Sequence, residues 1–268
     1  MTSTRDNPGA FRSASRRSLR GITSKAMSLV RQGDYRDAVV CALVDAANLF
    51  EARAGAAMPK RYRCACCGYE AHAFRHMFSG GHAVWNSACP GCDSRSRHRG
   101  LAVLLPRLLE ELQPRKVLHF APEPVLAKCF SGRDLTYETA DLYLDDATHP
   151  GVDVQDLPFG DRSYDFVLCN HVLEHVPDDH AALRELARVL RPSGVAVLTV
   201  PGDFSRMQTV RFEGELPNGH FRDYGRDFVD LLESVFARVR PIDMSELDLK
   251  TQSMSFAIRR GDLAFVCE

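Results

Sequence analysis

The stretch Asp156–Asp178, which reads DLPFGDRSYDFVLCNHVLEHVPD, decides the fold of this 268-residue chain. Its apolar run Tyr164–Cys169 predicts a strand, and the helical spacing of Asp178–Leu190 predicts a helix directly afterwards. A second apolar run, Val195–Val200, predicts the next strand. Strands that alternate with helices in this way predict a mostly parallel, doubly wound sheet, which is an α/β fold.

The same alternation extends in both directions from this stretch. We expect further strands at Lys116–Phe120, Leu135–Ala140, Arg238–Ile242 and Leu263–Val266. We expect further helices near Pro124–Phe130 and Arg226–Ser234, and one over residues 100–113 that Pro106 kinks and Pro114 ends. One side of that last helix carries Leu101, Leu104, Leu105, Leu108 and Leu109. The α/β domain is therefore predicted to occupy residues 100–268.

Three shorter segments are predicted to precede this domain. Residues 1–21 are rich in arginine and serine and are interpreted as a flexible basic arm. Residues 22–58 are predicted to be helical, with Asp34 as the N-cap of the second helix. The apolar stripe expected to pack that helix consists of Ala38, Val39, Ala42, Leu43, Ala46 and Phe50. The third segment, residues 59–99, is distinguished by its cysteines.

Two CxxC pairs in residues 59–99 predict a zinc-ribbon-like module. The predicted ligands are Cys64, Cys67, Cys89 and Cys92. This spacing places four thiolates tetrahedrally around Zn²⁺, and because all four positions are filled by protein the zinc is predicted to be structural. Cys66 stays an alternative to Cys64 or Cys67. Less favoured substitutes are His72, His76 and His82.

The composition is that of an ordinary globular protein. The net charge of −1 gives no general attraction to nucleic acid or membrane, and no apolar run is long enough to span a bilayer. The nine cysteines are odd in number and clustered, which argues against a secreted disulfide framework. We therefore expect a cytoplasmic protein. The sequence assigns no oligomeric state.

Residues 115–268 resemble the class I methyltransferases of type 11, which use S-adenosylmethionine. Two stretches carry the resemblance: Asp156–Val176, which contains DLPF, SYDF and HVLEHV, and Arg188–Gly194, which reads RVLRPSG. The resemblance implies a seven-stranded, Rossmann-like sheet behind the small N-terminal helical and zinc-ribbon-like module. It also implies S-adenosylmethionine as the cosubstrate.

The cofactor residues expected from this resemblance lie at strand ends. Asp141 ends the second strand about 20 residues after the first, where a carboxylate accepts both ribose hydroxyls. By the resemblance, Asp153 and Val154 meet the adenine edge. Asn170 and His171, just past the Tyr164–Cys169 strand, would line the methionine end.

The first loop departs from the general pattern of these enzymes. It reads HFAPE at His119–Glu123, without the usual acidic residue and glycine-rich turn. With the cysteine module and the Arg97-His98-Arg99 segment, it resembles a bacterial subfamily of these methyltransferases. His119, Ala121 and Glu123 are therefore candidate cofactor residues. The alternative is a prolyl turn that only shapes the strand–helix junction.

Two histidines are candidates for the catalytic base that a proton-bearing acceptor requires. His175 lies in the LEHV turn, and His220 lies in a GHxRxY loop after the fifth strand, where this fold closes over the acceptor. His220 is preferred. On a helical turn His171, Glu174 and His175 would share one face, and a hydrogen-bonded His–Glu pair is favoured there over a second metal ion.

Three functions fit the sequence. The leading one is O-methylation of a hydroxyl group on a small metabolite or saccharide. The runner-up is methylation of RNA, with the zinc module and basic arm holding the RNA and with Arg95, Arg97 and Arg99 contacting phosphates. The third is a non-enzymatic zinc-ribbon interaction protein on an inactive methyltransferase fold.

Overall fold

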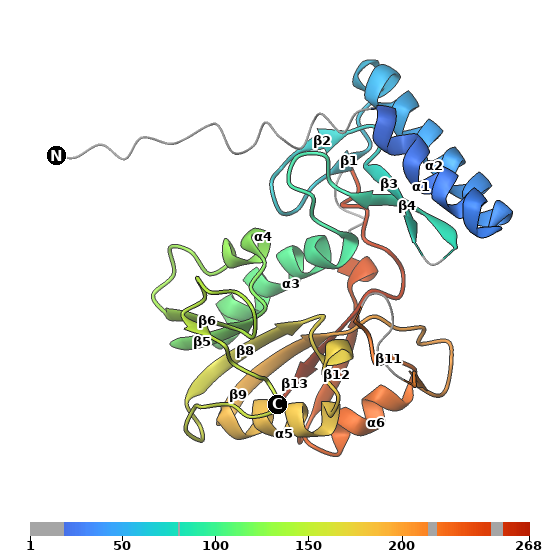
Figure 1. Cartoon of the computed structure of the whole chain (residues 1–268). Coiled ribbons are helices and arrows are strands. Elements are labelled where there is room, and N and C mark those ends of the chain that lie inside the picture. Colours follow the sequence, from blue (N-terminus) through green and yellow to red (C-terminus); the bar gives the residue numbers. More distant parts are fainter. Residues whose placement is uncertain (1–18, 80, 214–218, 248–253) are drawn as a thin grey trace. The chain divides into compact units, whose positions relative to one another are not determined.

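A computed structural model describes residues 19–79, 81–213, 219–247 and 254–268 of the chain. The chain forms two compact units, Met1–Tyr62 with Glu70–Pro90 and Arg63–Tyr69 with Gly91–Glu268 (Figure 1). The predicted basic arm lies outside the described residues up to residue 18, and the predicted domain limits stay predictions. Within the described ranges, no helix combines the length and the apolar character that crossing a membrane requires.

The first unit is built on a pair of helices, as the sequence predicts. They are α1 (Leu19–Gln32) and α2 (Tyr35–Ala54), followed by the short η2 (Gly55–Ala57). The short strands of this part of the chain are β1 (Tyr62–Arg63) with β2 (Glu70–Ala71), and β3 (Arg75–Ser79) with its antiparallel neighbour β4 (His82–Ala88).

The predicted packing face of α2 is wrong at every position except Ala38. Its buried residues are Ala38, Cys41 and Val44, whereas Val39 and Leu43 are 60% and 62% exposed. The buried face therefore consists of small and medium-sized side chains, which let neighbouring elements approach closely. A prediction based on the large apolar residues selects a different face of the helix. Asp34 does precede the helix, but its side chain makes no capping hydrogen bond.

The second unit contains the predicted sheet, with seven strands. They are β5 (Lys116–Phe120), β6 (Thr136–Asp141), β7 (His149–Pro150), β8 (Tyr164–Asn170), β9 (Leu190–Thr199), β12 (Val239–Asp243) and β13 (Leu263–Cys267). Their order is β12-β13-β9-β8-β5-β6-β7, and β13 alone runs antiparallel to its two neighbours. Five adjacent strands from β9 to β7 are parallel. The mostly parallel α/β prediction is confirmed.

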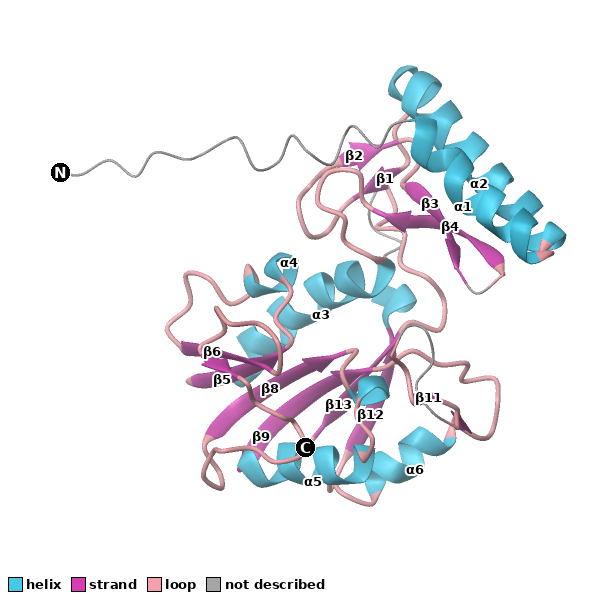
Figure 2. Ribbon diagram, viewed as in Figure 1, coloured by secondary structure: helices cyan, strands magenta, loops and turns pink. Residues whose placement is uncertain are grey.

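Helices cover both faces of this sheet. They are α3 (Ser96–Leu112), α4 (Pro124–Ala127), α5 (Asp179–Val189) and α6 (Asp227–Glu233), with the short η3 (Leu173–His175) and η4 (Met244–Leu247). Figure 2 shows α3 and α4 on one face and α5 and α6 on the other. A short strand pair, β10 (Val210–Arg211) with β11 (Arg222–Asp223), lies beside the sheet.

Alternating strand residues fill two separate cores. In β8, Phe166 and Leu168 pack with the leucine face of α3, while Val167 and Cys169 pack with α5 and α6. This period of two puts successive side chains on opposite faces. Because both faces are covered, the strands are apolar throughout, which is the pattern expected of parallel sheets.

The order of the strands fixes where a ligand can enter. The chain passes from β5 to β6 on one side, and β8 then pairs with the opposite side of β5. The loops after β5 and β8 therefore diverge at their carboxyl ends, and open α/β sheets bind ligands in the crevice at such a switch point.

Candidate active site

A hydrogen-bond network joins four adjacent strands and passes the carboxyl ends of β9, β8 and β5. Thr199 Oγ1, on β9, donates to Asn170 Oδ1 at the end of β8. Asn170 Nδ2 donates to Glu123 Oε1 in the loop after β5. His119 Nδ1, on β5, lies 2.8 Å from the hydroxyl of Tyr137 on β6. These hydrogen bonds hold the side chains that border the switch point in place.

Two residues of this rim have left-handed backbone conformations. Ala121, in the loop after β5, has φ +47°, and His171, in the loop after β8, has φ +54°. Such values are uncommon for residues other than glycine and concentrate at functional sites. Ala121 thus performs the sharp turn for which a glycine was expected, and its amide donates to the carbonyl of Ala140 at 3.0 Å.

Glu123 is the central carboxylate of the switch point. His98 Nε2 lies 3.3 Å from its Oε1 and His119 Nε2 lies 3.4 Å from its Oε2. The amide of Arg95 donates to His98 Nδ1 at 3.2 Å, so the neutral ring of His98 carries its proton on Nε2, toward Glu123. Burial acts to raise the pKa of Glu123, but His119 and His98 outweigh it and bring that pKa to about 2. The carboxylate is therefore ionised at neutral pH.

Several buried polar atoms at the switch point lack a well-aligned hydrogen bond to the described residues. They are Glu123 Oε2, His98 Nε2, His119 Nε2, and both carboxylate oxygens of Glu174. Buried polar atoms are seldom left in this state unless water or a ligand satisfies them. Their concentration at the switch point fits a ligand with a polar, positively charged end.

The two predicted aspartates lie at the ends of neighbouring strands. Asp141 ends β6, and its Oδ1 accepts from the amides of Tyr143 and Leu144 at 2.7 and 2.8 Å. Asp153 follows β7, and both its oxygens accept from the amide nitrogen of the Gln155 side chain, at 3.1 and 3.0 Å. Val154 is buried in the core, so it offers a ligand its backbone rather than its side chain.

The loop after β8 carries a second group of polar side chains. Glu174 is fully buried, and His171 Nδ1 lies 3.0 Å from its Oε1. His175 Nδ1 donates to the carbonyl of Gly219 at 3.0 Å, which leaves Nε2 as the acceptor nitrogen of a neutral ring. The rings of His175 and His220 meet edge to face, with centroids 4.7 Å apart. The two predicted base candidates are thus neighbours.

This group combines the His171–Glu174 pair with the neighbouring imidazole of His220. Burial lowers the pKa of His220, opposed by the charge of Glu174 and reinforced by the nearby His175. His220 is therefore unprotonated at neutral pH and able to accept a proton. Ligand atoms of Glu174, His175 and His220 lie within 4.8 Å of one another, but the close approach of His171 to Glu174 favours a His–Glu pair over a second metal ion.

Arg222, the arginine of the GHxRxY loop, contacts the protein itself. Its side chain is buried, and it donates to the carbonyls of Leu173 and Pro177, both at 2.7 Å. Its Nε lies 3.4 Å from Asp179 Oδ2, which also accepts from the hydroxyl of Tyr224. Arg222 therefore holds the HVLEHV turn in place and is not available to a ligand phosphate.

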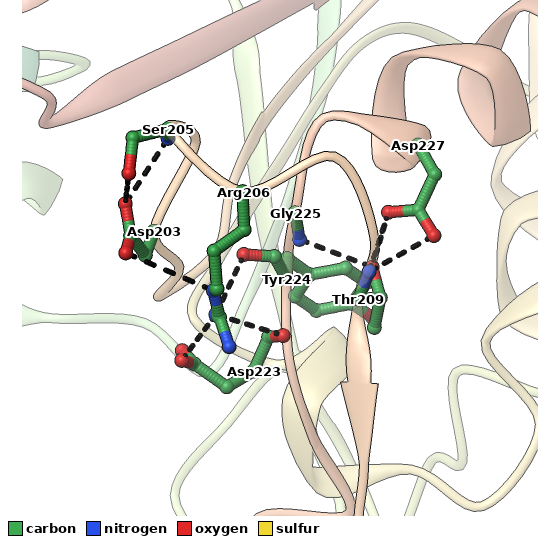
Figure 3. Close-up of polar contacts among 8 residues, drawn as sticks. All are labelled: Asp203, Ser205, Arg206, Thr209, Asp223, Tyr224, Gly225 and Asp227. Carbon is green, nitrogen blue, oxygen red and sulfur yellow. Dashed lines mark hydrogen bonds and ion pairs between the residues drawn. The ribbon is translucent and has the colours of Figure 1, made fainter.

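The loop after β9 is fastened to β11 and to the segment that follows it (Figure 3). Arg206 Nη2 donates to Asp223 Oδ2 at 2.6 Å, and the hydroxyl of Thr209 donates to Asp227 Oδ1 at 2.6 Å. Gly225 packs directly on this loop, since a Cβ there would lie 2.5 Å from the carbonyl carbon of Gln208. The acceptor side of the site is thus bordered by two loops tied together.

The four predicted zinc ligands come together. Ligand atoms of Cys64, Cys67, Cys89 and Cys92 lie within 4.8 Å of one another. Cys64 Sγ and Cys92 Sγ are 3.7 Å apart, close to the roughly 3.8 Å between sulfurs in a tetrahedral site with Zn–S bonds of about 2.3 Å. Cys66 lies outside this set of four, although its thiol contacts Cys64 and Ser94. None of the nine cysteines forms a disulfide.

Two of the three proposed histidine substitutes, His72 and His76, have partners outside the cysteine cluster. His72 Nδ1 lies 2.9 Å from the carbonyl of Pro59, and His76 Nδ1 accepts from the amide of Asn86 at 3.0 Å. The donor set of the cluster is therefore four sulfurs, which suits zinc.

Of the three arginines that the RNA alternative assigned to phosphate contacts, Arg99 was assigned incorrectly. Arg99 is fully buried and donates to the carbonyls of Ser94, Phe256 and Ala257 at 2.6–2.7 Å, so it cannot contact phosphate. His98 contacts Glu123 and belongs to the site. The sequence did indicate that the Arg97-His98-Arg99 segment lies near the site, because it begins α3, the helix that precedes β5. The sequence does not show which of the three side chains points to the strand ends.

Comparison with known proteins finds similarity to methyltransferases over part of the chain. A model described as a methyltransferase domain matches residues 132–198. Demethylmenaquinone methyltransferase of Staphylococcus carnosus is 47% identical over 45 residues, 17% of this chain and 19% of the relative. The Staphylococcus aureus (strain JH9) protein of that name is 38% identical over 71 residues, 24% of this chain and 29% of its own. The matches thus span less than a third of these curated relatives.

Solved structures resemble the chain more distantly. A Burkholderia thailandensis 1,6-didemethyltoxoflavin-N1-methyltransferase with bound S-adenosylhomocysteine has a TM-score of 0.44 and 17% identity, over 63% of this chain and 76% of its own. A complex between the Haloferax volcanii Trm112 methyltransferase activator and a methyltransferase has a TM-score of 0.45 and 17% identity, over 64% and 89% of the two chains.

Proposed function

Because residues 132–198 belong to the methyltransferase domain family, we propose that the chain transfers the methyl group of S-adenosylmethionine to a hydroxyl group of a small metabolite or saccharide. The observation that carries the proposal is the set of buried, unpartnered polar atoms among the described residues at the switch point. The family match begins before β6 and ends in β9, so it spans the strands that carry Asp141 and Asn170.

We assign the cofactor to the carboxyl ends of β5, β6, β7 and β8. Asp141 accepts from the ribose hydroxyls, and Asp153 with the backbone of Val154 meets the adenine. Glu123 accepts from the α-ammonium group, since its Oε2 is buried without an aligned hydrogen bond to any described residue. His119 and Asn170 hold that carboxylate, while Ala121 and His171 bring the backbone close to the methionine end.

The chain's own contribution to the reaction is alignment and proton transfer. Bound S-adenosylmethionine supplies an electrophilic methyl group whose C–S bond breaks as the acceptor oxygen forms its C–O bond in line. His220 takes the proton of that hydroxyl, because burial keeps its imidazole neutral. His175, held by the carbonyl of Gly219, is the alternative base. Glu174 stabilises whichever imidazole becomes charged.

The acceptor is assigned to a small molecule for a structural reason. Of the three arginines considered for phosphate contacts, Arg99 is committed to backbone carbonyls. The curated relatives are named for demethylmenaquinone, which is also a small molecule. We place a structural Zn²⁺ at the four cysteines, where the sulfur donor set and the 3.7 Å spacing of Cys64 and Cys92 support it.

The test begins with cofactor binding. Calorimetry with S-adenosylhomocysteine should show binding to the parent protein, and Asp141→Ala should weaken it by about 10- to 150-fold, since a buried charge-assisted hydrogen bond contributes about 1.5–3 kcal/mol. Methyl-tritiated S-adenosylmethionine, supplied with metabolite and RNA fractions of a deletion strain, then identifies the acceptor. Label confined to RNA would contradict the small-molecule assignment, and absence of binding would contradict the methyltransferase.

A further inference from the structure

Arg97 is an arginine near the switch point for which the described residues provide no hydrogen-bond or ion-pair partner at its buried Nε. It lies in the first turn of α3. Two other buried arginines differ from Arg97 in this respect, because Arg99 and Arg222 each donate to two or more backbone carbonyls. Arg97 therefore has donors to offer to a ligand.

The surroundings of Arg97 place it over the proposed cofactor pocket. Burial lowers the pKa of Arg97, and the carboxylates of Glu123 and Glu174 act on it in the opposite direction. Those two carboxylates follow β5 and β8, the strands that diverge at the switch point. His98, the next residue, lies 3.3 Å from Glu123, so this turn of α3 is held against the loop after β5.

The charges at this point match a zwitterion. A guanidinium that is removed from water without a partner carries a large desolvation cost, which a carboxylate offsets through two parallel charge-assisted hydrogen bonds. An α-amino acid end carries an ammonium and a carboxylate on the same carbon. Glu123 Oε2 suits the ammonium, and Arg97 is the nearby cation that suits the carboxylate.

We propose that Arg97 binds the α-carboxylate of S-adenosylmethionine and so fixes the methionine end of the cofactor. This rests on the proposed function. It also assigns the segment after the cysteine cluster to cofactor binding rather than to RNA. The competing source of the same carboxylate chemistry is an acidic group on the acceptor, which the following experiment separates.

The experiment compares three ligands that differ in their amino acid end. S-adenosylhomocysteine has the carboxylate, its decarboxylated analogue retains the amine alone, and 5′-methylthioadenosine has neither. Calorimetry on Arg97→Gln should show S-adenosylhomocysteine weakened by about 10- to 150-fold, with the other two ligands bound as in the parent. Arg97→Lys should recover part of the loss, because it keeps the charge without the planar fork.

Arg107→Gln is the matched control, since it removes an exposed arginine from the same helix. It should bind all three ligands like the parent. Equal loss of all three ligands in Arg97→Gln would mean a structural role and would overturn the proposal. Unchanged S-adenosylhomocysteine affinity would overturn it too and would point to an acidic acceptor. Failure of the folded parent to bind S-adenosylhomocysteine would instead remove the proposed function itself.

Discussion

At the scale of single residues, the ionisation of Glu123 links the site to stability. Its pKa is about 2 in the folded chain against an ordinary value of 4.5. A carboxyl group with a lowered folded pKa contributes stability that is fully present above its unfolded pKa and is lost as the pH falls toward the folded one. We therefore expect the Glu123 contribution, about 3 kcal/mol at 1.36 kcal/mol per pKa unit, to disappear between pH 4.5 and 2.

Glu123→Gln isolates this contribution. The variant should be less stable than the parent at neutral pH, and the difference should shrink as the pH is lowered through that window. Denaturant unfolding at a series of pH values measures it. Asp134→Asn, at a side chain that is 95% exposed, should follow the parent at every pH. A Glu123→Gln deficit that is independent of pH would show that the carboxylate is not held ionised by its histidines.

His220 makes a second prediction at this scale. Burial lowers the pKa of His220, so the rate should rise with pH through a value below 6.5 and level off at neutral pH, as the imidazole becomes able to accept a proton. General base catalysis typically contributes about 10²–10⁴-fold, and His220→Ala should lose turnover of that order while retaining cofactor affinity. Single-turnover rates measure this once an acceptor is identified.

His175→Ala is the comparison for that experiment. It should disturb both rate and binding, because it also removes the contact to Gly219. Near-parent turnover in His220→Ala, with a loss confined to His175→Ala, would move the base to the LEHV turn. Unchanged rates in both variants would mean that alignment alone accounts for the catalysis.

At the scale of elements, the packing of the two acceptor-side loops depends on Gly225. A Cβ at Gly225 would lie 2.5 and 2.6 Å from the carbonyl carbon and oxygen of Gln208, which are backbone atoms that cannot rotate away. Gly225→Ala should therefore lower the free energy of unfolding by about 1–3 kcal/mol. Gly160→Ala is the control, since its added Cβ meets Ser163 at an ordinary 3.5 Å. Equal stability of the two variants would show that the loop shifts without cost.

The same scale shows what a sequence can and cannot predict. The central strands of the sheet were predictable because residues such as Val167 and Leu168 are both buried, on opposite faces, so that each of these strands appears as an apolar run. The two-residue strand β7 (His149–Pro150) has no such run and was missed. The start of β9 at Leu190 was missed by five residues, because Arg191–Ser193 are exposed and not an apolar run, yet extended. The packing face of α2 was missed because small and medium-sized residues fill it.

For side chains at the site, position was predictable and partners were not. Asp141 and Asn170 were predictable because strand ends are visible in the sequence. The sequence did not predict the roles of Arg97, Arg99 and Arg222. A shift of one helical turn or of one strand residue changes the direction of a side chain, and this direction decides whether a guanidinium contacts a backbone carbonyl or a ligand. The two buried arginines satisfy carbonyls that the local hydrogen-bond ladders leave free, a demand that only the folded chain reveals.

At the scale of the whole molecule, the cysteine cluster should support the cofactor pocket. Ser94 Oγ lies 3.2 Å from both Cys64 Sγ and Cys92 Sγ, and the carbonyl of Ser94 accepts from Arg99 at 2.6 Å. Arg99 also fastens this turn to the carbonyls of Phe256 and Ala257. The next contact along the chain is that of His98 with Glu123 at 3.3 Å. The short segment Ser94–Arg99 thus contacts both the cysteine cluster and the proposed cofactor pocket.

Loss of zinc should therefore weaken cofactor binding as well as stability. Structural zinc contributes folding free energy directly, and without it Ser94 loses the fixed sulfurs beside it, so the first turn of α3 is less firmly held over Glu123. We expect metal analysis to give close to one zinc per chain, and chelation or Cys92→Ser to lower both the unfolding temperature and the affinity for S-adenosylhomocysteine. Cys129→Ser, a thiol outside the cluster, should change neither. Zinc-free protein that stays folded and binds S-adenosylhomocysteine as tightly as the zinc form would show that the two sites are independent, because the contacts through Ser94 and Arg99 would then hold α3 without the metal.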